Sequence, residues 1–373
     1  MENYNIKKPT KPHRQVKPDE IPSKEEIRKM EIRDQNLNEL GIEIAVLDKD
    51  ELDNDYEEDI DKLNASILIM QDKEIPDELK QKFLKKKEKN YMEHTIKNQT
   101  FDEERALYNI KNTEVVDCTF AGPADGESVL KETRNILVKN CNFSLRYPFW
   151  HTRGFELDNV SMDELTRAAI WYAYDGVIKN TKMDGIKCIR ECENIQIEDS
   201  SAISPEFGWR TRNLSIRRCE MDSVYFLFEC KNVEIEELKM KGKYSFQYVE
   251  NMTITNSYLD TKDAFWHGKN ITVKDSVLKG EYLAWFSEDL TLINCKIIGT
   301  QPLCYCKNLK LINCTMEDTD LSFEYSDVEA EIQGNIVSVK NPKSGTIIAD
   351  SVGEIIWDDP VMEVKGKVIL REK

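Results

Sequence analysis

The segments EDLTLINCKI (residues 288–297) and KNLKLINCTM (residues 307–316) repeat the phrase L-x-L-I-N-C after nineteen residues. A fixed interval near twenty residues indicates stacked, similar structural units, here termed rungs. The apolar residue that opens each copy, termed the anchor, can be aligned along most of the chain. The twelve anchors are Thr113, Ile136, Phe155, Gly176, Ile195, Leu214, Val233, Met252, Ile271, Leu290, Leu309 and Val328. From Gly176 onward they recur every nineteen residues.

Each rung carries two apolar segments. A second apolar residue stands two positions after the anchor, as in Val233 and Ile235, with a polar residue between them. Such alternation is typical of a strand with one buried face. A large apolar residue follows seven positions after the anchor, as in Met221 and Met240. Two short strands per rung are therefore expected to point side chains into one core.

Asparagine and aspartate occupy the position before almost every anchor, as in Asn213, Asn232 and Asn251. Both residue types tolerate left-handed backbone conformations. Stacked copies are expected to form a hydrogen-bonded ladder. Leucine-rich repeats have a similar period but need a different Leu/Asn spacing and a helical segment. The pattern therefore predicts an all-β fold, a right-handed parallel β-helix of about twelve rungs.

Several phrases, in a fixed order, also carry a family resemblance. They are ERALYNI, GESVLKETRNI, YPFWH, KDAFWHGKNITV, GEYLAWFSEDLTLINC and GTQPLCY, between about residues 99 and 350. Through them the chain resembles an uncharacterised bacterial domain-of-unknown-function family of pectin-lyase-like β-helices. The resemblance implies the β-helix fold and no established activity.

Composition restricts the partners. The net charge of −17 argues against a general nucleic-acid or anionic-membrane binder, and no apolar run approaches the ~20 residues of a membrane span. No signal-peptide pattern is seen, so we expect the ten cysteines to be reduced and the protein to be cytoplasmic. Cys118, Cys141, Cys219, Cys295 and Cys314 share one column, which predicts packed thiols. No metal site or cofactor is expected.

The first part of the chain differs from the repeats. Residues 1–35, rich in Lys, Pro and Glu, are expected to form a flexible charged tail. Residues 36–95 contain the strand candidates GIEIAVLD and ASILIMQD and are expected to form a small α/β unit or a cap. Residues 96–373 are assigned to the β-helix.

Five of the six tryptophans share the column five positions before the anchor. Because neighbouring residues of an extended strand point to opposite sides, only one of this column and the next can face inward. The next column is more polar, so we expect the tryptophans to lie inside. The outer strip would then present His151, Tyr172, Glu191, Arg210, Glu229, Tyr248 and His267, while Arg190 would be a polar intrusion into the Trp column.

This strip is the predicted site. Glu191 and Glu229 are two rungs apart, roughly 9.6 Å, a separation suited to an inverting glycosidase, with Arg210 between them. Arg210 would keep both carboxylates ionised, which opposes a general-acid role. His151, Tyr172, Arg190, Tyr248, Trp266 and His267 are the predicted ligand-binding residues.

The sequence leaves three functions open. The first is a scaffold that binds a glycan or a protein on its aromatic and charged lateral face. The second is a carbohydrate-active hydrolase or lyase acting on an intracellular sugar. The third is a structural or assembly protein. Whether the protein is an enzyme, and its oligomeric state, are left undecided.

Overall fold

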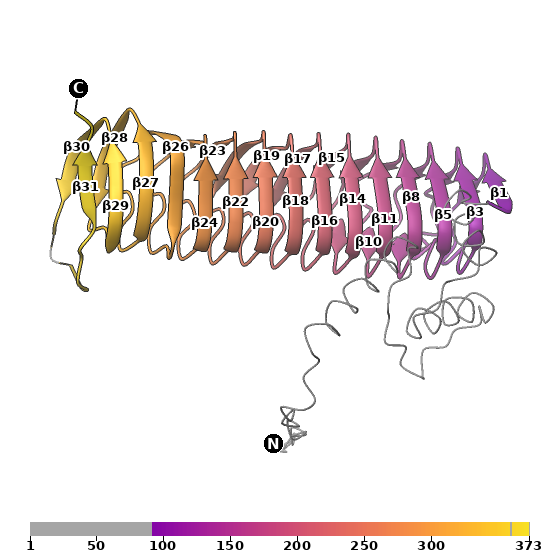
Figure 1. Cartoon of the computed structure of the whole chain (residues 1–373). Coiled ribbons are helices and arrows are strands. Elements are labelled where there is room, and N and C mark those ends of the chain that lie inside the picture. Colours follow the sequence, from indigo (N-terminus) through magenta and orange to yellow (C-terminus); the bar gives the residue numbers. More distant parts are fainter. Residues whose placement is uncertain (1–91, 359, 373) are drawn as a thin grey trace, which may run out of the picture. The chain divides into compact units, whose positions relative to one another are not determined.

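The computed structural model describes residues 92–358 and 360–372, and Tyr91–Lys373 forms one compact unit. The predicted tail, residues 1–35, and residues 36–91 of the predicted α/β or capping segment lie outside the described residues. The described part is a single coil of parallel strands (Figure 1). Its first face contains β1 (His94–Lys97), β3 (Lys111–Val116), β5 (Arg134–Lys139), β8 (Arg153–Asp158), β11 (Tyr174–Lys179), β14 (Glu193–Glu198), β16 (Arg212–Arg217), β18 (Lys231–Glu236), β20 (Glu250–Thr255), β22 (Lys269–Lys274), β24 (Glu288–Ile293), β26 (Leu309–Glu317), β27 (Asp327–Gln333), β29 (Ser344–Ala349) and β31 (Lys367–Leu370).

The register on this face is the one that the repeats predict. Leu292 pairs with Leu311, and Leu309 pairs with Val328, so the two L-x-L-I-N-C phrases are neighbouring rungs. The face has fifteen strands, three more than the predicted anchors. The additional strands are β1, β29 and β31. His94 stands one rung before Thr113 but is polar and exposed, which is why an apolar anchor does not mark the first rung.

Shorter strands build the rest of each rung. The second face contains β2 (Thr100–Phe101), β4 (Thr119–Phe120), β6 (Asn142–Phe143), β9 (Ser161–Met162), β12 (Lys182–Asp184), β15 (Ser201–Ile203), β17 (Glu220–Val224), β19 (Lys239–Lys243), β21 (Tyr258–Lys262), β23 (Val277–Lys279) and β25 (Lys296–Ile298). The third side has β7 (Phe149–Trp150), β10 (Ile170–Trp171) and β13 (Ile189–Arg190). A two-stranded sheet of β28 (Asn335–Lys340) and β30 (Ser351–Ile356) lies near the C-terminal end.

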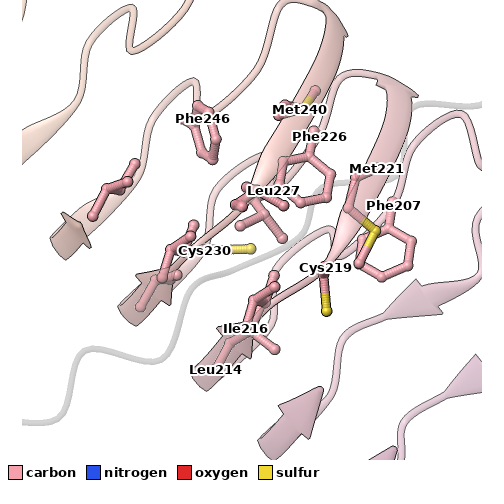
Figure 2. Close-up of a cluster of buried hydrophobic side chains, with 14 of the residues drawn as sticks. Phe207, Leu214, Ile216, Cys219, Met221, Phe226, Leu227, Cys230, Met240 and Phe246 are labelled. Atoms are coloured by element: carbon pink, nitrogen blue, oxygen red, sulfur yellow. The ribbon is translucent and has the colours of Figure 1, made fainter. Parts of the chain in front are cut away.

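The core is a stack of repeated side chains. Figure 2 shows Leu214, Ile216 and Met221 of one rung beside Met240 of the next, with Phe226 filling the third side. All five are at most 2 % exposed. At Gly176 the packing leaves no space for a side chain, because an added Cβ would lie 2.1 Å from Cζ of Phe155. The glycine at that anchor is therefore required by the phenylalanine on the rung before it.

The predicted asparagine ladder is present. Asn232 donates from Nδ2 to Oδ1 of Asn213 over 2.9 Å and accepts from Asn251 over 3.0 Å. Asn232 has a φ of 57°, in the left-handed region. Each amide thus satisfies one neighbour on either side while its residue turns the corner.

The cysteines are packed thiols, as predicted. All ten are free and buried. In the shared column, Sγ of Cys295 lies 3.3 Å from O of Ile293, and Oγ of Ser276 donates to O of Lys274 in the same way. Burial raises the pKa of Cys230 to about 12, so this thiol is held protonated. Within the described residues no cluster of His, Cys, Asp and Glu could hold a metal ion.

The expected inward orientation of the tryptophan column is wrong. Trp150, Trp171 and Trp266 are half-buried on the outside, whereas the preceding residues, Phe149 and Ile170, are fully buried. The residue after each tryptophan adopts positive φ, which breaks the alternation of an extended strand. Both columns therefore face outward, and Arg190 is not a charge inside the core, since its side chain is 19 % exposed. Gln247 in the middle of the column and Cys304 and Phe323 at its end are buried.

Candidate functional site

The third side of the coil carries three outward columns of residues, and from here on we call it the lateral face. It lies between the second face of one rung and the first face of the next. The columns are the residues eight, five and four positions before each anchor. The first and third columns have left-handed backbones: φ is 58° at Tyr225 and 57° at Glu229. Between these corners, Phe226 and Leu227 point inward and are fully buried. The left-handed corners thus press two side chains into the core and leave three outside.

Three of the five tryptophans in this column are fixed to the backbone of the neighbouring rung, whereas Nε1 of Trp150 and Nε1 of Trp171 make no such bond. Nε1 of Trp209 donates to O of Tyr225 over 2.8 Å, and Nε1 of Trp266 donates to O of Tyr282 over 2.7 Å. Trp285 makes the equivalent bond to O of Gln301 over 2.7 Å. Each indole covers a corner and satisfies a carbonyl there. Trp209, Trp266 and Trp285 are therefore rigid parts of the surface.

A charged cluster occupies the first half of the lateral face. Nη1 of Arg210 lies 3.2 Å from Oε1 of Glu191, and its Nε lies 2.7 Å from Oε2 of Glu229. Burial alone would raise the pKa of Glu191. The hydrogen bonds from Tyr172 and Arg210, together with the charge of Arg190, lower that pKa below its usual value. Glu191 is therefore held as a carboxylate.

Arg190 joins this cluster to the tryptophans. Its guanidinium carbon lies 5.3 Å from the ring centroid of Trp209 and 6.0 Å from that of Trp171. Its Nη1 is 3.8 Å from Oε2 of Glu206. His151 stands at the edge of the cluster, and its Nδ1 lies 2.8 Å from Oε1 of Glu132. The cations and carboxylates of this half pair with one another.

An aromatic ladder continues the face in the second half. Tyr248, His267, Phe286 and Tyr305 come from four successive rungs, and we call them the outer ladder. Neighbouring ring centroids are 4.9, 5.1 and 4.8 Å apart, with interplanar angles of 11°, 7° and 13°. Tyr248 is 47 % exposed and Phe286 is 43 % exposed. Beside the ladder, Trp266 and Trp285 stack at 5.5 Å with an angle of 3°.

The predicted site residues thus fall into two groups on one face. Tyr172, Arg190, Glu191, Arg210 and Glu229 meet in the charged cluster, with His151 at its edge. Tyr248, Trp266 and His267 lie in the aromatic half. Their predicted catalytic and ligand-binding roles stay predictions.

Sequence reasoning missed the first column of the lateral face. Tyr225, Tyr244 and Tyr282 recur there, with Asp263 between Tyr244 and Tyr282. The rings of Tyr225 and Tyr244 stack at 4.9 Å. The nineteen-residue spacing of these tyrosines was the available signal. Phe286 and Tyr305 share the column of Tyr248 and His267 but were not included among the predicted site residues.

Comparison with models of known protein families identifies the family of this chain. Residues 94–370 match the family model described as "Protein of unknown function (DUF3737)". This match spans well over half of the chain, which therefore belongs to that family. The fold is a pectin-lyase-like right-handed parallel β-helix. No curated protein sequence matches the chain.

Solved structures give distant matches. The A-module of mannuronan C-5 epimerase AlgE6 from Azotobacter vinelandii is 10 % identical, covers 71 % of this chain and 89 % of its own, and has a TM-score of 0.27. The surface adhesin PfbA of Streptococcus pneumoniae is 8 % identical, with coverages of 74 % and 91 % and a TM-score of 0.30. An exopolygalacturonase from Thermotoga maritima is 9 % identical, with coverages of 74 % and 84 % and a TM-score of 0.27.

Helices suited to crossing a membrane are not found among the described residues.

Proposed function

We propose that this protein is a non-catalytic scaffold that binds an extended polypeptide along its lateral face. The observation that carries the proposal is the outer ladder, whose rings remain exposed although they stack on one another. Aromatic residues are enriched where protein partners bind. Exposed Tyr248 and Phe286 and half-buried Trp266 and Trp285 supply such a surface over several rungs.

The ring orientation favours a polypeptide over a sugar. A sugar packs on the face of an aromatic ring. Within the outer ladder, each face of His267 and Phe286 is covered by a neighbouring ring. These residues therefore present their edges to solvent. Edges suit the burial of apolar side chains from a partner and give no platform for a sugar ring.

The charged cluster supports a role in binding over a role in catalysis. Glycoside hydrolysis requires one carboxyl group that keeps a proton near neutral pH. The pKa of Glu191 is lowered, and Arg210 is bonded to both Glu191 and Glu229. Two carboxylates bonded to one guanidinium make a fixed polar surface that can select the charge pattern of a partner.

We place the protein in a reducing compartment, the cytoplasm. Its ten free, buried thiols support this assignment because disulfides form and persist in oxidising compartments. A cytoplasmic partner with an apolar segment flanked by charges would complement the two halves of the face.

The test compares two double variants in the source organism. Tyr248→Ser with Phe286→Ser removes two exposed rings of the outer ladder. Ile203→Ser with Tyr258→Ser removes two exposed apolar side chains, 61 % and 44 % exposed, from the second face. Tagged wild-type protein and both variants are purified, and the bound proteins are quantified by mass spectrometry.

The proposal predicts at least one protein that the wild type and the second-face variant retain and the outer-ladder variant loses by about ten-fold or more. A glycan array is probed with the same three proteins. Glycan binding that the outer-ladder variant abolishes, or identical bound proteins for all three samples, would overturn the proposal.

A further inference from the structure

Two aromatic columns of the lateral face are interrupted at the same place. In the tryptophan column, Gln247 stands between Phe228 and Trp266. In the first column, Asp263 stands between Tyr244 and Tyr282. Nε2 of Gln247 donates to O of Asp263 over 3.2 Å. Gln247 thus makes the bond that an indole makes on other rungs, without filling the space of an indole.

The interruption gives two rings a face with no aromatic neighbour in their own columns. Tyr244 stacks on Tyr225 on one side, and Trp266 stacks on Trp285 on the other. The opposite faces of these two rings are turned toward the rungs of Asp263 and Gln247, respectively. Nζ of Lys243 lies 5.6 Å from the ring centroid of Tyr244, so a cation already approaches this ring. The interruption is therefore the part of the lateral face where Tyr244 and Trp266 each lack a second stacked ring.

The carboxylate at this place has no partner of its own. Asp263 is 5 % exposed, yet among the described residues its side chain accepts no hydrogen bond and forms no ion pair. The adjacent cation, Lys262, has its Nζ 2.8 Å from Oε2 of Glu281 and 4.9 Å from the ring centroid of Tyr282. Burial raises the pKa of Asp263, and the opposing charge of Lys262 does not cancel this effect.

A carboxylate between aromatic faces is suited to a cation. The ring face attracts positive charge through its quadrupole, and the carboxylate supplies the counter-charge and hydrogen-bond acceptors. A buried carboxylate without a partner costs free energy, which a bound ammonium or guanidinium group would recover.

We propose that Asp263, between Tyr244 and Trp266, binds the ammonium or guanidinium group of a Lys or Arg side chain of the polypeptide partner. This inference rests on the proposed function, and it specifies the partner: a cationic side chain next to apolar side chains that contact the outer ladder. The overall charge of −17 supports the approach of such a segment.

The test uses small probes and therefore does not need the natural partner. Capped Gly-Arg-Gly and Gly-Lys-Gly are added to the full chain, and binding is measured by saturation-transfer NMR at physiological salt. Capped Gly-citrulline-Gly is the uncharged control for the guanidinium probe. Free spermidine is the arm that distinguishes a small amine from a protein side chain.

Three variants make the result specific. Asp263→Asn removes the carboxylate, and Gln247→Trp restores the aromatic column. Glu234→Gln makes the same charge change as Asp263→Asn at an exposed carboxylate on β18, for which no ion pair is formed among the described residues. We expect Asp263→Asn and Gln247→Trp to weaken the cationic probes by about ten-fold, and Glu234→Gln to leave them unchanged.

No binding by the wild type, or equal binding by wild type and Asp263→Asn, would overturn the cation site. Spermidine binding that is about ten-fold tighter than peptide binding would overturn the assignment to a protein side chain. A failed probe experiment leaves the outer-ladder comparison standing, and a failed outer-ladder comparison leaves the probe result standing. The two proposals therefore fail separately.

Discussion

Two aromatic ladders run side by side in this β-helix, only two residues apart in sequence. Phe246 and Phe265 stack at 4.9 Å and 11°, and they are 0 % and 1 % exposed. Tyr248 and His267 stack at the same 4.9 Å and 11°, but Tyr248 is 47 % exposed. The repeat itself therefore produces the stacking in both ladders. The difference in burial determines whether a ladder stabilises the coil or remains available to a partner. The inner ladder stabilises the coil, whereas the outer ladder keeps apolar surface available.

The largest effect is expected in the inner ladder. Phe265→Ala should lower the free energy of unfolding by about 3–5 kcal/mol, because a buried ring is replaced by a cavity. Equilibrium unfolding in denaturant, with intact secondary structure checked by circular dichroism, measures this change. A loss below about 1 kcal/mol would show that the inner ladder is not a close-packed core.

A polar ladder tests whether exposed ladders can stabilise at all. Asn232→Ala should cost about 1–2 kcal/mol, because alanine disfavours the left-handed backbone and two amide hydrogen bonds are lost. Asn232→Gly is the control, since glycine accepts positive φ and removes only the hydrogen bonds. If both variants are equally unstable, the backbone conformation contributes nothing.

The charge of Asp263, at the interruption of the aromatic columns, should lower the free energy of unfolding of the wild type. Asp263→Asn should raise the free energy of unfolding by about 1 kcal/mol at neutral pH, because it removes an unpaired, nearly buried charge. The folded-state pKa is raised, so the cost is full above that pKa and disappears as the folded protein takes up the proton. Below the usual Asp pKa of about 3.9, the wild type and the variant should be equally stable. A pH series of thermal unfolding measures this, and a gain that is constant at all pH values would contradict it.

The smallest effect on stability is expected in the outer ladder. Phe286→Ala should change the free energy of unfolding by less than about 1 kcal/mol, because the side chain is already 43 % exposed. The same variant should lose most of its binding to the partner. A loss of stability as large as that of Phe265→Ala would make the outer ladder a structural element and remove the contrast.

Most of the fold could be predicted because the inward residues repeat with two strict periods, two and nineteen. These periods gave the register of Leu292 with Leu311 and the burial of the cysteine column. The first rung was missed because the solvent-exposed position of His94 has no need for an apolar anchor. The site was predicted less well. Its corners place residues such as Glu229 and Tyr248 at positive φ, and nothing in those residue types signals a left-handed backbone.

The same corners explain the error at the tryptophans. Strand alternation was applied to Trp171 and Tyr172, whereas the backbone at Tyr172 is left-handed, with a φ of 49°. Asp263 was missed for a different reason. A single aspartate in a column of tyrosines becomes informative only when the neighbouring Gln247 and the missing partner are seen together.

The most direct test of the account is photo-crosslinking at two positions of matched exposure. A benzophenone amino acid replaces Phe286 of the outer ladder, 43 % exposed, or Tyr258 of the second face, 44 % exposed. After irradiation in the source organism, the adducts are identified by mass spectrometry. The account predicts a defined protein adduct at residue 286 that is absent at residue 258. The same adducts at both positions, or none at residue 286, would contradict it.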